Sequence, residues 1–248
     1  MNASNGPYFA ISVIQARMSS TRLPGKVLRE MAGSPMLELM LERVRADSDV
    51  PTIVATSTEP SDDPIEELCN ALDVPIIRGP LHDVLSRFIQ AIDTYQPEIV
   101  IRLTGDNPLT DAMAVQKGID KFRAFFTGGE REEAGISNHL ADRTDPHGYA
   151  VEVLRADKMR WLAEQDLSDE EKEHVTLGFI NRGIYGSFHI LEGGEDIRWT
   201  VDYPEDFEYM SKLFNDLGRN ANTTEALKWS ATHAHPKIDD TRKIWAKK

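Results

Sequence analysis

The sequence predicts an α/β protein with a three-layer, doubly wound and mostly parallel sheet. Short β-rich runs alternate with amphipathic segments, and the first run, residues 8–14, is almost wholly apolar, as in a central strand covered on both faces. The 248-residue chain is 40% apolar, which is enough for a large core, and its one cysteine, Cys69, rules out an intrachain disulfide. We expect a single domain over residues 8–235, with flexible tails at 1–7 and 236–248.

The first half of the chain alternates strands and helices regularly. After the strand at 8–14, Ser34 and Pro35 match the start of a helix, because serine caps helices and proline suits their first turn. Asp63 and Glu66 resemble a capping box that begins the next helix. Apolar periodicity predicts the remaining elements, namely strands at 51–57, 74–77 and 98–103 and a helix at 81–95.

The second half is less regular, and we expect an irregular insertion over residues 135–195. A helix is predicted at 113–126, and the last helix begins near Pro204. Between them, periodicity indicates strands at 148–154, 184–191 and 197–200 and helices at 155–165 and 169–181.

The distribution of charge limits the classes of ligand. A formal net charge of -13 argues against general nucleic-acid binding, because a phosphate backbone is held mainly by dense Lys and Arg. Phosphate binding would therefore need a local basic cluster. Segment 15–29 contains such a cluster, because it has four basic residues and no acidic one. The basic residues are Arg17, Arg22, Lys26 and Arg29. A solvated basic loop would look the same, so both interpretations stay open on charge alone.

Features of membrane and secreted proteins are missing from the sequence. No apolar run approaches the roughly 18 residues that a membrane-spanning helix needs. The segment 1–10 lacks the basic start and apolar stretch of a secretory signal. We therefore expect a cytoplasmic protein without a membrane partner.

The segment 15–26, QARMSSTRLPGK, directly follows the first predicted strand. Its small and hydroxyl residues allow backbone N–H groups to turn toward a ligand, and its cations match phosphate oxygens. Loops at the carboxyl ends of strands are where open α/β sheets bind ligands. The segment is not the common phosphate loop, because Val27 follows Gly25-Lys26 where that motif has Ser or Thr.

Two aspartates follow other predicted strands. Asp106 lies in the segment 103–109, LTGDNPL, and Asp202 lies in the segment 199–206, WTVDYPED. Either could simply be a polar turn residue at the start of a helix. Asp106 also has a site-like setting, because it ends a predicted central strand with Gly105 before it and Pro108 two residues after it, so both interpretations stay open.

The segment 15–26 resembles the signature of the sugar-activating cytidylyltransferases, the family of the CMP-Kdo and CMP-acylneuraminate synthetases. It is most similar to their spore-coat polysaccharide SpsF-like branch, and the resemblance runs from about residue 11 to 210. It implies a Rossmann-like fold of the nucleotide-diphospho-sugar transferase kind. It also implies transfer of CMP from CTP to a sugar acid or related acidic acceptor, with Mg²⁺ and release of pyrophosphate.

The resemblance also implies roles for individual residues. Asp106 and Asp202 would converge from two strand ends and bind Mg²⁺, which prefers oxygen ligands together with substrate phosphates. The catalytic set would be Arg17, Arg22, Lys26, Asp106 and Asp202. The nucleotide would be bound by Gln15, Ala16, Arg17, Ser20, Arg22, Lys26, Thr56, Arg78 and Asp106. For Thr56 a plain turn is an equal alternative, and Arg78 has the alternative of a surface arginine before a turn.

The acceptor region matches the family less well. Residues His147, Glu152, Glu173 and His174 correspond to its acceptor-binding positions, although a helical histidine such as His174 is often only structural. Segment 127–145 matches no relative, so the acceptor stays unidentified. The resemblance further implies a homodimer through the insertion at 135–195.

Two other classes of function compete with a cytidylyltransferase. A glycosyltransferase of the same broad fold would use a nucleotide-sugar donor and an Asp-x-Asp motif. Asp47-Ser48-Asp49 fits that pattern, but it precedes the second strand and reads as a polar turn. A non-catalytic nucleotide-binding module would not need Asp106 or Asp202, and both are present.

Overall fold

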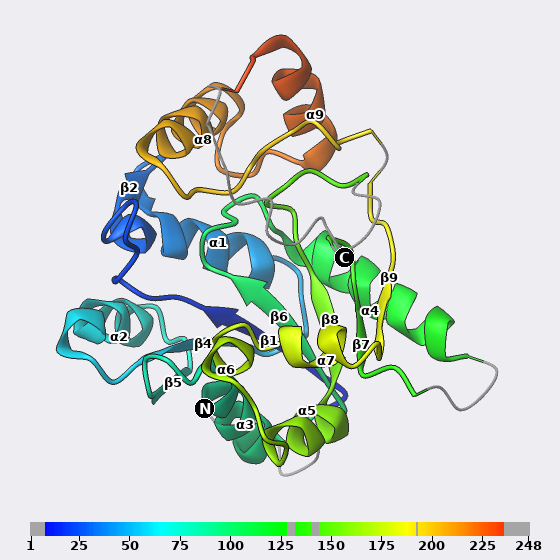
Figure 1. Cartoon of the computed structure of the whole chain (residues 1–248). Coiled ribbons are helices and arrows are strands. Elements are labelled where there is room, and N and C mark those ends of the chain that lie inside the picture. The colour runs from blue at the N-terminus through cyan, green and yellow to red at the C-terminus, as the bar shows by residue number, and fades with distance from the viewer. Residues whose placement is uncertain (1–7, 128–131, 140–143, 192, 236–248) are drawn as a thin grey trace.

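A computed structural model describes residues 8–127, 132–139, 144–191 and 193–235. At its centre lies a seven-stranded sheet in the order β5-β4-β1-β6-β8-β7-β9 (Figure 1). The predicted tails lie outside the described residues. The strands of this sheet are β1 (Ala10–Gln15), β4 (Thr52–Ser57), β5 (Ile76–Gly79), β6 (Ile99–Thr104), β7 (Gly135–Ser137), β8 (Glu152–Arg155) and β9 (Tyr185–Ser187).

All neighbouring strands in this sheet are parallel except at β8, which runs against both of its neighbours. The predicted fold class, a doubly wound and mostly parallel α/β sheet, is therefore confirmed. The chain starts at β1, moves outward through β4 to β5, and returns to the other side of β1 as β6. A reversal of strand order of this kind opens a crevice at the carboxyl ends of the strands. The loops after Gln15 and Thr104 border that crevice.

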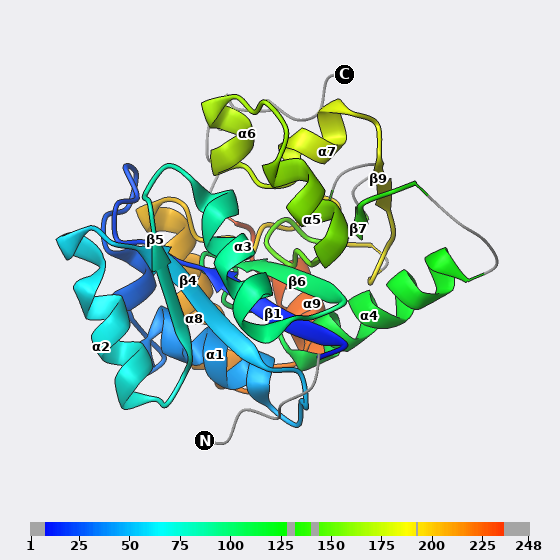
Figure 2. The same ribbon diagram turned by 90° about the horizontal axis from the view of Figure 1, so that it is seen from below.

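Helices cover both faces of the sheet and so complete three layers (Figure 2). Along β1, Ile11 and Val13 pack into one apolar cluster and Ala10 and Ile14 into the other, as expected for a strand buried on both faces. No helix in the described ranges is both long and apolar enough to cross a membrane. The helices on one face are α1 (Met36–Arg45), α2 (Asp63–Ala71), α4 (Ala112–Phe126), α8 (Pro204–Leu217) and α9 (Thr223–Thr232), and those on the other are α3 (Val84–Tyr95), α5 (Ala156–Ala163), α6 (Asp169–Glu173) and α7 (Leu177–Asn181).

The predicted helix start at Ser34 and Pro35 is wrong. These residues form the short strand β3 (Ser34–Pro35), which pairs antiparallel with β2 (Glu30–Met31), and α1 begins only at Met36. The turn between them has positive φ at Ala32 (52°) and Gly33 (85°), as a type I′ hairpin turn requires. Ser34 and Pro35 therefore belong to a hairpin, although their residue types suit the start of a helix.

The predicted capping box at Asp63 and Glu66 is also wrong. The cap position of α2 is Asp62, at the end of a 3₁₀ turn (Pro60–Asp62), and among the described residues its side chain makes no capping hydrogen bond to the helix. The carboxylates of Asp63 and Glu66 instead form ion pairs with Arg78 at the end of β5. Both carboxylates thus bind an arginine distant in sequence and do not cap the helix.

Four predicted elements of the second half differ from the structure. The strand predicted at 148–154 is confined to β8, and that at 184–191 to β9. Residues 197–200 form only an isolated bridge between Arg198 and His147. The helix predicted at 169–181 is divided into α6 and α7. Strand β7 and helix α9 were not predicted from the sequence.

The junction of α6 and α7 is held by one acidic side chain. Glu171 forms a capping box with Ser168, and its Oε1 accepts a hydrogen bond from Arg182 Nη1 at 2.8 Å in α7's C-terminal cap. Hydrogen bonds from the Ser168 backbone N–H and from Arg182 lower the pKa of Glu171 to about 2. A carboxyl whose pKa is depressed on folding stabilises the protein above its unfolded pKa and loses this effect as the pH falls.

We therefore expect Glu171→Gln to weaken the acid sensitivity of folding. The wild-type protein should lose the contribution of Glu171 as the pH falls from 4.5, the ordinary pKa, toward about 2. Urea titrations at pH 7, 4.5 and 3 would measure this as a shallower decline of unfolding free energy in the variant. An identical decline in both proteins would show that Glu171 does not contribute to acid stability.

Candidate active site

A cavity of about 440 Å³ opens at the carboxyl ends of β1 and β6, where the strand order reverses. We call it the larger cavity, because a smaller one, described below, lies beside it. Seven of the predicted nucleotide-binding residues lie in its wall. The lining residues are Gln15, Ala16, Arg17, Ser19, Ser20, Thr21, Arg22, Lys26, Val27, Val84, Arg87, Thr104, Gly105, Asp106, Glu173, His174 and Asp202.

The loop after β1 is anchored by a buried carboxylate that the sequence analysis missed. Asp62, which is 0% exposed, accepts a hydrogen bond from the Met18 backbone N–H at 2.7 Å. It also accepts hydrogen bonds from the backbone N–H and the hydroxyl of Ser57 at the end of β4. At the other end of the loop, Gly25 has a φ of 69°, the left-handed conformation that favours glycine. The cationic loop is thus fixed at both ends.

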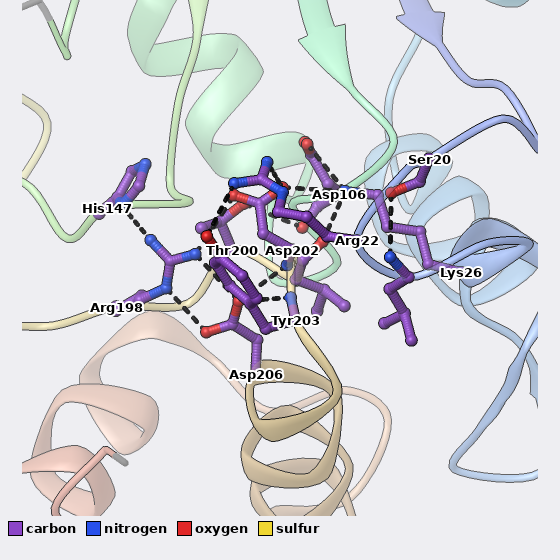
Figure 3. A network of polar contacts seen from close by, with 12 residues as sticks. Ser20, Arg22, Lys26, Asp106, His147, Arg198, Thr200, Asp202, Tyr203 and Asp206 are labelled. Carbon is purple, nitrogen blue, oxygen red and sulfur yellow. Dashed lines mark hydrogen bonds and ion pairs between the residues drawn. The ribbon is translucent and has the colours of Figure 1, made fainter. Parts of the chain in front are cut away.

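Lys26 joins two carboxylates that come from separate parts of the chain (Figure 3). Its Nζ lies 3.3 Å from Asp106 Oδ2 and 3.1 Å from Asp202 Oδ1, and it donates to the Val201 carbonyl at 2.6 Å. Arg22 Nη2 donates to the same Oδ1 of Asp202 at 2.8 Å. The predicted convergence of Asp106 and Asp202 is present, with a lysine ammonium between them.

This pair of carboxylates has the chemistry of a divalent-cation site. Both oxygens lie within 3.3 Å of one ammonium nitrogen, so one small cation could contact both. In the part of the chain that the structure describes, no group of three or more His, Cys, Asp and Glu residues could hold a metal ion. Mg²⁺ commonly takes one or two protein carboxylates together with water and substrate phosphates. Asp106 and Asp202 fit that mode of binding.

A close backbone approach brings Asp202 to Asp106. The Val201 N–H donates to the Asp106 carbonyl at 2.8 Å, and the Trp199 N–H donates to the His147 carbonyl at 2.6 Å. Gly148 allows this approach, because a Cβ at that position would lie 2.1 Å from the Thr200 nitrogen. The segment therefore runs along the turn after β6 without being a strand of the sheet.

Arg198 and Asp206 hold the Asp202 side chain in place (Figure 3). Asp206 is 0% exposed and accepts from Arg198 Nε at 2.7 Å, from Arg198 Nη2 at 2.9 Å and from the Asp202 N–H at 2.8 Å. Arg198 Nη2 also donates to Asp202 Oδ2 at 3.2 Å. Both carboxylate oxygens of Asp202 are thus oriented by cationic donors.

The carboxyl groups of this network are held in their charged forms. Burial raises the pKa of Asp106, but the positive charge of Lys26 and hydrogen bonds from Thr104 and Lys26 outweigh it and lower this pKa below its ordinary value. Burial likewise opposes ionisation of Asp206, yet hydrogen bonds from Arg198 and His235 bring its pKa far below the usual range. Both groups are therefore anionic at neutral pH.

We expect Arg198→Met to lower the free energy of unfolding by about 3 kcal/mol, because it leaves the buried Asp206 without its main counterion. Arg198→Lys should recover part of the stability but not the fork that contacts both aspartates. Chemical denaturation of the three proteins measures the difference. A loss below about 0.5 kcal/mol in Arg198→Met would show that the pair adds little to folding.

A second, smaller cavity of about 210 Å³ meets the larger one at the carboxylate pair. Thr104, Asp106 and Asp202 line both cavities. The two cavities are thus neighbouring spaces with a common wall that contains the two carboxylates. The other residues that line the smaller cavity are Arg102, Asn107, His139, His147, Gly148, Ala150, Glu152 and Thr200.

Glu152 is the buried acidic group of the smaller cavity, with a residue exposure of 2%. It forms an ion pair with Arg102 on the neighbouring strand, and its Oε1 lies 3.4 Å from His139 Nε2. Burial raises the pKa of Glu152, but the charges of Arg102 and His139 lower it by more. Beside them, His147 Nδ1 lies 2.9 Å from Arg198 Nη1, and because arginine only donates, this nitrogen must accept. A neutral His147 therefore carries its proton on Nε2.

The four predicted acceptor-binding residues divide between the two cavities. His147 and Glu152 line the smaller cavity, whereas Glu173 and His174 line the larger one. Glu173 Oε1 lies 3.1 Å from Arg17 Nη2, so an ion pair joins the end of α6 to the loop after β1. The larger cavity is thus bordered by both halves of the chain.

Two predicted nucleotide-binding residues lie elsewhere. Thr56 and Arg78, both in the described part of the chain, are not among the residues that line the two cavities. Thr56 is 0% exposed inside β4. The Arg78 guanidinium forms ion pairs with Asp63 and Glu66, and its Nε donates a hydrogen bond to the Ser57 carbonyl at 2.9 Å. In this arrangement Arg78 ties β5 to α2.

Five further polar residues of the site had no predicted role. Four of them lie outside any motif, and only tertiary contacts bring them to the cavities or to the residues that line them. For Arg87 a signal existed, because segment 83–87, DVLSR, is similar to the SpsF-like pattern, but no role was assigned to the arginine. The five residues are Asp62, Arg87, Arg102, His139 and Arg198.

A cationic loop opposite two converging carboxylates, at the switch point of a mostly parallel sheet, defines a nucleotide-dependent transferase of the α/β class. A family model described as cytidylyltransferase matches residues 11–183. The chain belongs to this family and is thus a CTP-dependent nucleotidyltransferase.

Individual relatives agree with this assignment. The chain is 33% identical over 223 residues to the spore coat polysaccharide biosynthesis protein SpsF of Bacillus subtilis, covering 86% of this chain and 89% of SpsF. It is 29% identical over 215 residues to a 3-deoxy-manno-octulosonate cytidylyltransferase of Yersinia pseudotuberculosis, covering 82% and 84% of the two chains. The predicted resemblance to the SpsF-like and CMP-Kdo synthetase-like enzymes is therefore confirmed.

Solved structures show the same fold. A cytidylyltransferase from Leptospira borgpetersenii matches with a TM-score of 0.83 and 26% identity, over 93% of this chain and 98% of that one. A CMP:2-keto-3-deoxy-manno-octonic acid synthetase solved with CTP matches with a TM-score of 0.62, over 84% of this chain and 98% of that one. At 21% identity the second likeness supports the fold alone.

Proposed function

We propose that this protein transfers CMP from CTP to a small acidic acceptor, such as a sugar acid, in a Mg²⁺-dependent reaction that releases pyrophosphate. The observation that carries the proposal is the wall that the two cavities have in common. A nucleotide in the larger cavity and an acceptor in the smaller one would meet at Asp106 and Asp202. An acceptor oxygen would there attack the α-phosphorus while the bond to the β-phosphate breaks.

The residues of the loop supply the charge that this reaction needs. Phosphoryl-type transfer depends mainly on positioning and on neutralising charge at the phosphate oxygens. Arg22 and Lys26 already lie against Asp202 and can turn to the leaving pyrophosphate. Asp106 and Asp202 would hold Mg²⁺, which would supply positive charge to the phosphate oxygens when bound. Replacement of the Lys26 contacts by the ion would free the ammonium group for a phosphate oxygen.

The smaller cavity suits an acceptor with hydroxyl and carboxylate groups. Arg102 and His139 offer cationic or neutral donors, His147 offers an Nε2 proton when neutral, and Glu152 offers an accepting carboxylate. Glu152 balances much of the positive charge of Arg102 and His139. Hydrogen bonds to the hydroxyl groups of the acceptor should therefore contribute as much to its recognition as attraction of its acidic group. This mixture supports a sugar acid as the acceptor.

Pyrophosphate release tests the proposal. CTP, UTP, ATP and GTP would each be incubated with Mg²⁺ and a panel of sugar acids, sugar phosphates and phosphonates. We expect release from CTP with at least one acidic acceptor and none after chelation of the metal. Release of CDP or UDP from a nucleotide sugar would instead identify a glycosyltransferase. Tight CTP binding without turnover on a broad panel would favour the non-catalytic module.

The predicted homodimer belongs to the same proposal. Segment 135–195 supplies β7, β8 and β9 to one edge of the sheet as well as α5, α6 and α7. Strand β9 stands at that edge of the sheet, where a second copy could pack. A sizing column with light-scattering detection would give a mass near 56 kDa, about twice the 27.9 kDa of one chain, if the dimer forms.

A further inference from the structure

The guanidinium of Arg198 lies between His147 on one side and Asp202 and Asp206 on the other (Figure 3). Its Nε and Nη2 donate to the two oxygens of Asp206 at 2.7 and 2.9 Å. Nη2 also donates to Asp202 Oδ2 at 3.2 Å, and Nη1 donates to His147 Nδ1 at 2.9 Å. Asp202 and His147 both line the smaller cavity, whereas Arg198 is not among its described lining residues. Arg198 therefore links two side chains of the cavity wall from behind.

The contact with Asp206 fixes the plane of this guanidinium. A carboxylate that accepts from two nitrogens of one arginine leaves the planar fork a single orientation. Asp206 is itself held, because it is 0% exposed and accepts from the backbone N–H groups of Asp202 and Tyr203 at 2.8 and 2.9 Å. Burial opposes the charge of Arg198, but hydrogen bonds to Asp206 and the charges of both aspartates raise its pKa. The donors that face His147 and Asp202 thus have directions set by Asp206.

The contact with Arg198 also decides which hydrogen bonds His147 can make. Arginine has only donors, so His147 Nδ1 accepts, and the proton of a neutral ring lies on Nε2. A second proton on Nδ1 would break this hydrogen bond and place two cations together. In this form the ring donates from Nε2 and has no nitrogen left that can accept a proton. His147 is therefore a hydrogen-bond donor of the cavity wall and not a base.

Main-chain hydrogen bonds hold His147 close to the segment that leads to Asp202. The His147 N–H donates to the Ile197 carbonyl at 2.8 Å. The N–H groups of Trp199 and Thr200 donate to the His147 carbonyl at 2.6 and 3.1 Å. Because backbone and side-chain contacts act together, the donor at His147 and the carboxylate of Asp202 belong to one unit of fixed geometry.

We propose that Arg198 is a positioning residue that couples the two substrates, because it holds the donor for the acceptor and a ligand of the metal ion in one arrangement. This inference rests on the proposed function and names the residue that aligns its two sides. Arg198 engages Oδ2 of Asp202, so Oδ1, which lies 3.1 Å from Lys26 Nζ, stays directed to the common wall. An acceptor that binds His147 is thereby placed beside the carboxylate pair.

The position of the ring proton on His147 in the ligand-free protein gives the first test. Nitrogen-15 spectra of histidine rings distinguish protonated from unprotonated nitrogens, and the His147 signals are assigned by their loss in His147→Asn. We expect one tautomer in the wild type, with the proton on Nε2. Arg198→Lys keeps a cation for Asp206 but not the planar fork, so His147 should populate both tautomers. A wild-type proton on Nδ1, or an unchanged tautomer in Arg198→Lys, would overturn the proposal.

Steady-state kinetics with CTP and the most active sugar acid of the panel gives the second test. His147→Asn keeps an oxygen near the place of Nδ1, to which Arg198 can donate, but has no group at the place of Nε2. Its effect should fall mainly on KM for the sugar acid, which rises about ten-fold, the value of one hydrogen bond. Arg198→Lys should raise this KM similarly and also lower kcat by about 10- to 100-fold, because Asp202 loses an orienting donor as well.

The double variant shows whether Arg198 acts through His147. If it does, adding His147→Asn to Arg198→Lys should raise KM for the sugar acid by no more than about two-fold, because the donor is already misplaced. Independent roles would multiply the two effects to about 100-fold and contradict the coupling. Arg160→Lys on α5 is the matched control, because Arg160 pairs with Asp93 at 2.9 Å and neither residue lines the two cavities. It should leave the His147 signals and the kinetics as in the wild type.

The outcomes separate this inference from the proposed function. A wild type that releases no pyrophosphate from CTP with any acceptor contradicts the proposed function, whatever the spectra show for His147. An active wild type, with an Arg198→Lys variant that changes kcat alone, contradicts only the coupling to the acceptor. If Arg198→Lys does not fold, His147→Asn still decides, because it leaves the pair of Arg198 and Asp206 in place. An unchanged KM for the sugar acid in that variant would overturn the proposal.

Discussion

Asp106→Asn is expected to lower the rate of pyrophosphate release from CTP by about three orders of magnitude, the upper range for removal of one group that stabilises a transition state. Asp106 lies in the wall common to both cavities, and its low pKa keeps it ionised at working pH. Asparagine has the same shape but no charge, so it is a poor ligand for a divalent cation. The effect should therefore fall on turnover and on the apparent affinity for Mg²⁺.

The fold should survive this substitution. Lys26 keeps its hydrogen bond to the Val201 carbonyl and its ion pair with Asp202, so no buried charge is stranded. Asp157→Asn on α5 is the control, because that carboxylate is 61% exposed and Arg155 is its one ion-pair partner among the described residues. We expect it to change the rate by less than two-fold, in line with the small effects of surface ion pairs. Rates like the wild type for Asp106→Asn at saturating Mg²⁺ would remove the metal assignment.

The parts of the site that could be predicted from sequence are those that depend on local chain order. The loop at 15–26 follows an apolar strand directly, so its position at the carboxyl end of β1 follows from the fold class alone. The same holds for Asp106 after β6. The approach of Asp202 to Asp106 depends instead on Gly148 and on hydrogen bonds between distant segments. There the sequence pattern provided only candidate ligands, and their contact was predicted by the family resemblance alone.

The errors of prediction have a common physical cause. Ser34, Pro35, Asp63 and Glu66 are residue types that suit the start of a helix, and nothing local argued against that use. In the structure Ser34 and Pro35 belong instead to the hairpin of β2 and β3, and Asp63 and Glu66 form ion pairs with Arg78. Arg87 shows the converse. Its burial, with one hydrogen bond to the Leu81 carbonyl and no partner for Nε among the described residues, is invisible in sequence, because an arginine on a predicted helix is ordinarily a solvated side chain.

Lys26→Met tests whether the ammonium group holds the place of a metal ion. Lys26 is 8% exposed and is the one group that contacts Asp106, Asp202 and Val201 together in the described structure. Its loss leaves two carboxylates facing each other, which should lower the free energy of unfolding by about 2 kcal/mol, less than for a fully buried pair because Asp106 is 30% exposed. Turnover should fall by about 10³-fold, since a cation at the phosphates is lost.

A Mg²⁺ titration of thermal stability without nucleotide then distinguishes the two roles of the lysine. In the wild type the ammonium competes with the ion for both carboxylates, so the midpoint should rise only slightly with Mg²⁺. In Lys26→Met the ion should bind the vacant pair and raise the midpoint by several degrees, as expected for a ligand specific to the folded state. Lys26→Met with Asp202→Asn removes the repulsion and should recover stability but neither the Mg²⁺ response nor turnover. An equal Mg²⁺ response in the wild type and in Lys26→Met would contradict a metal site at this pair.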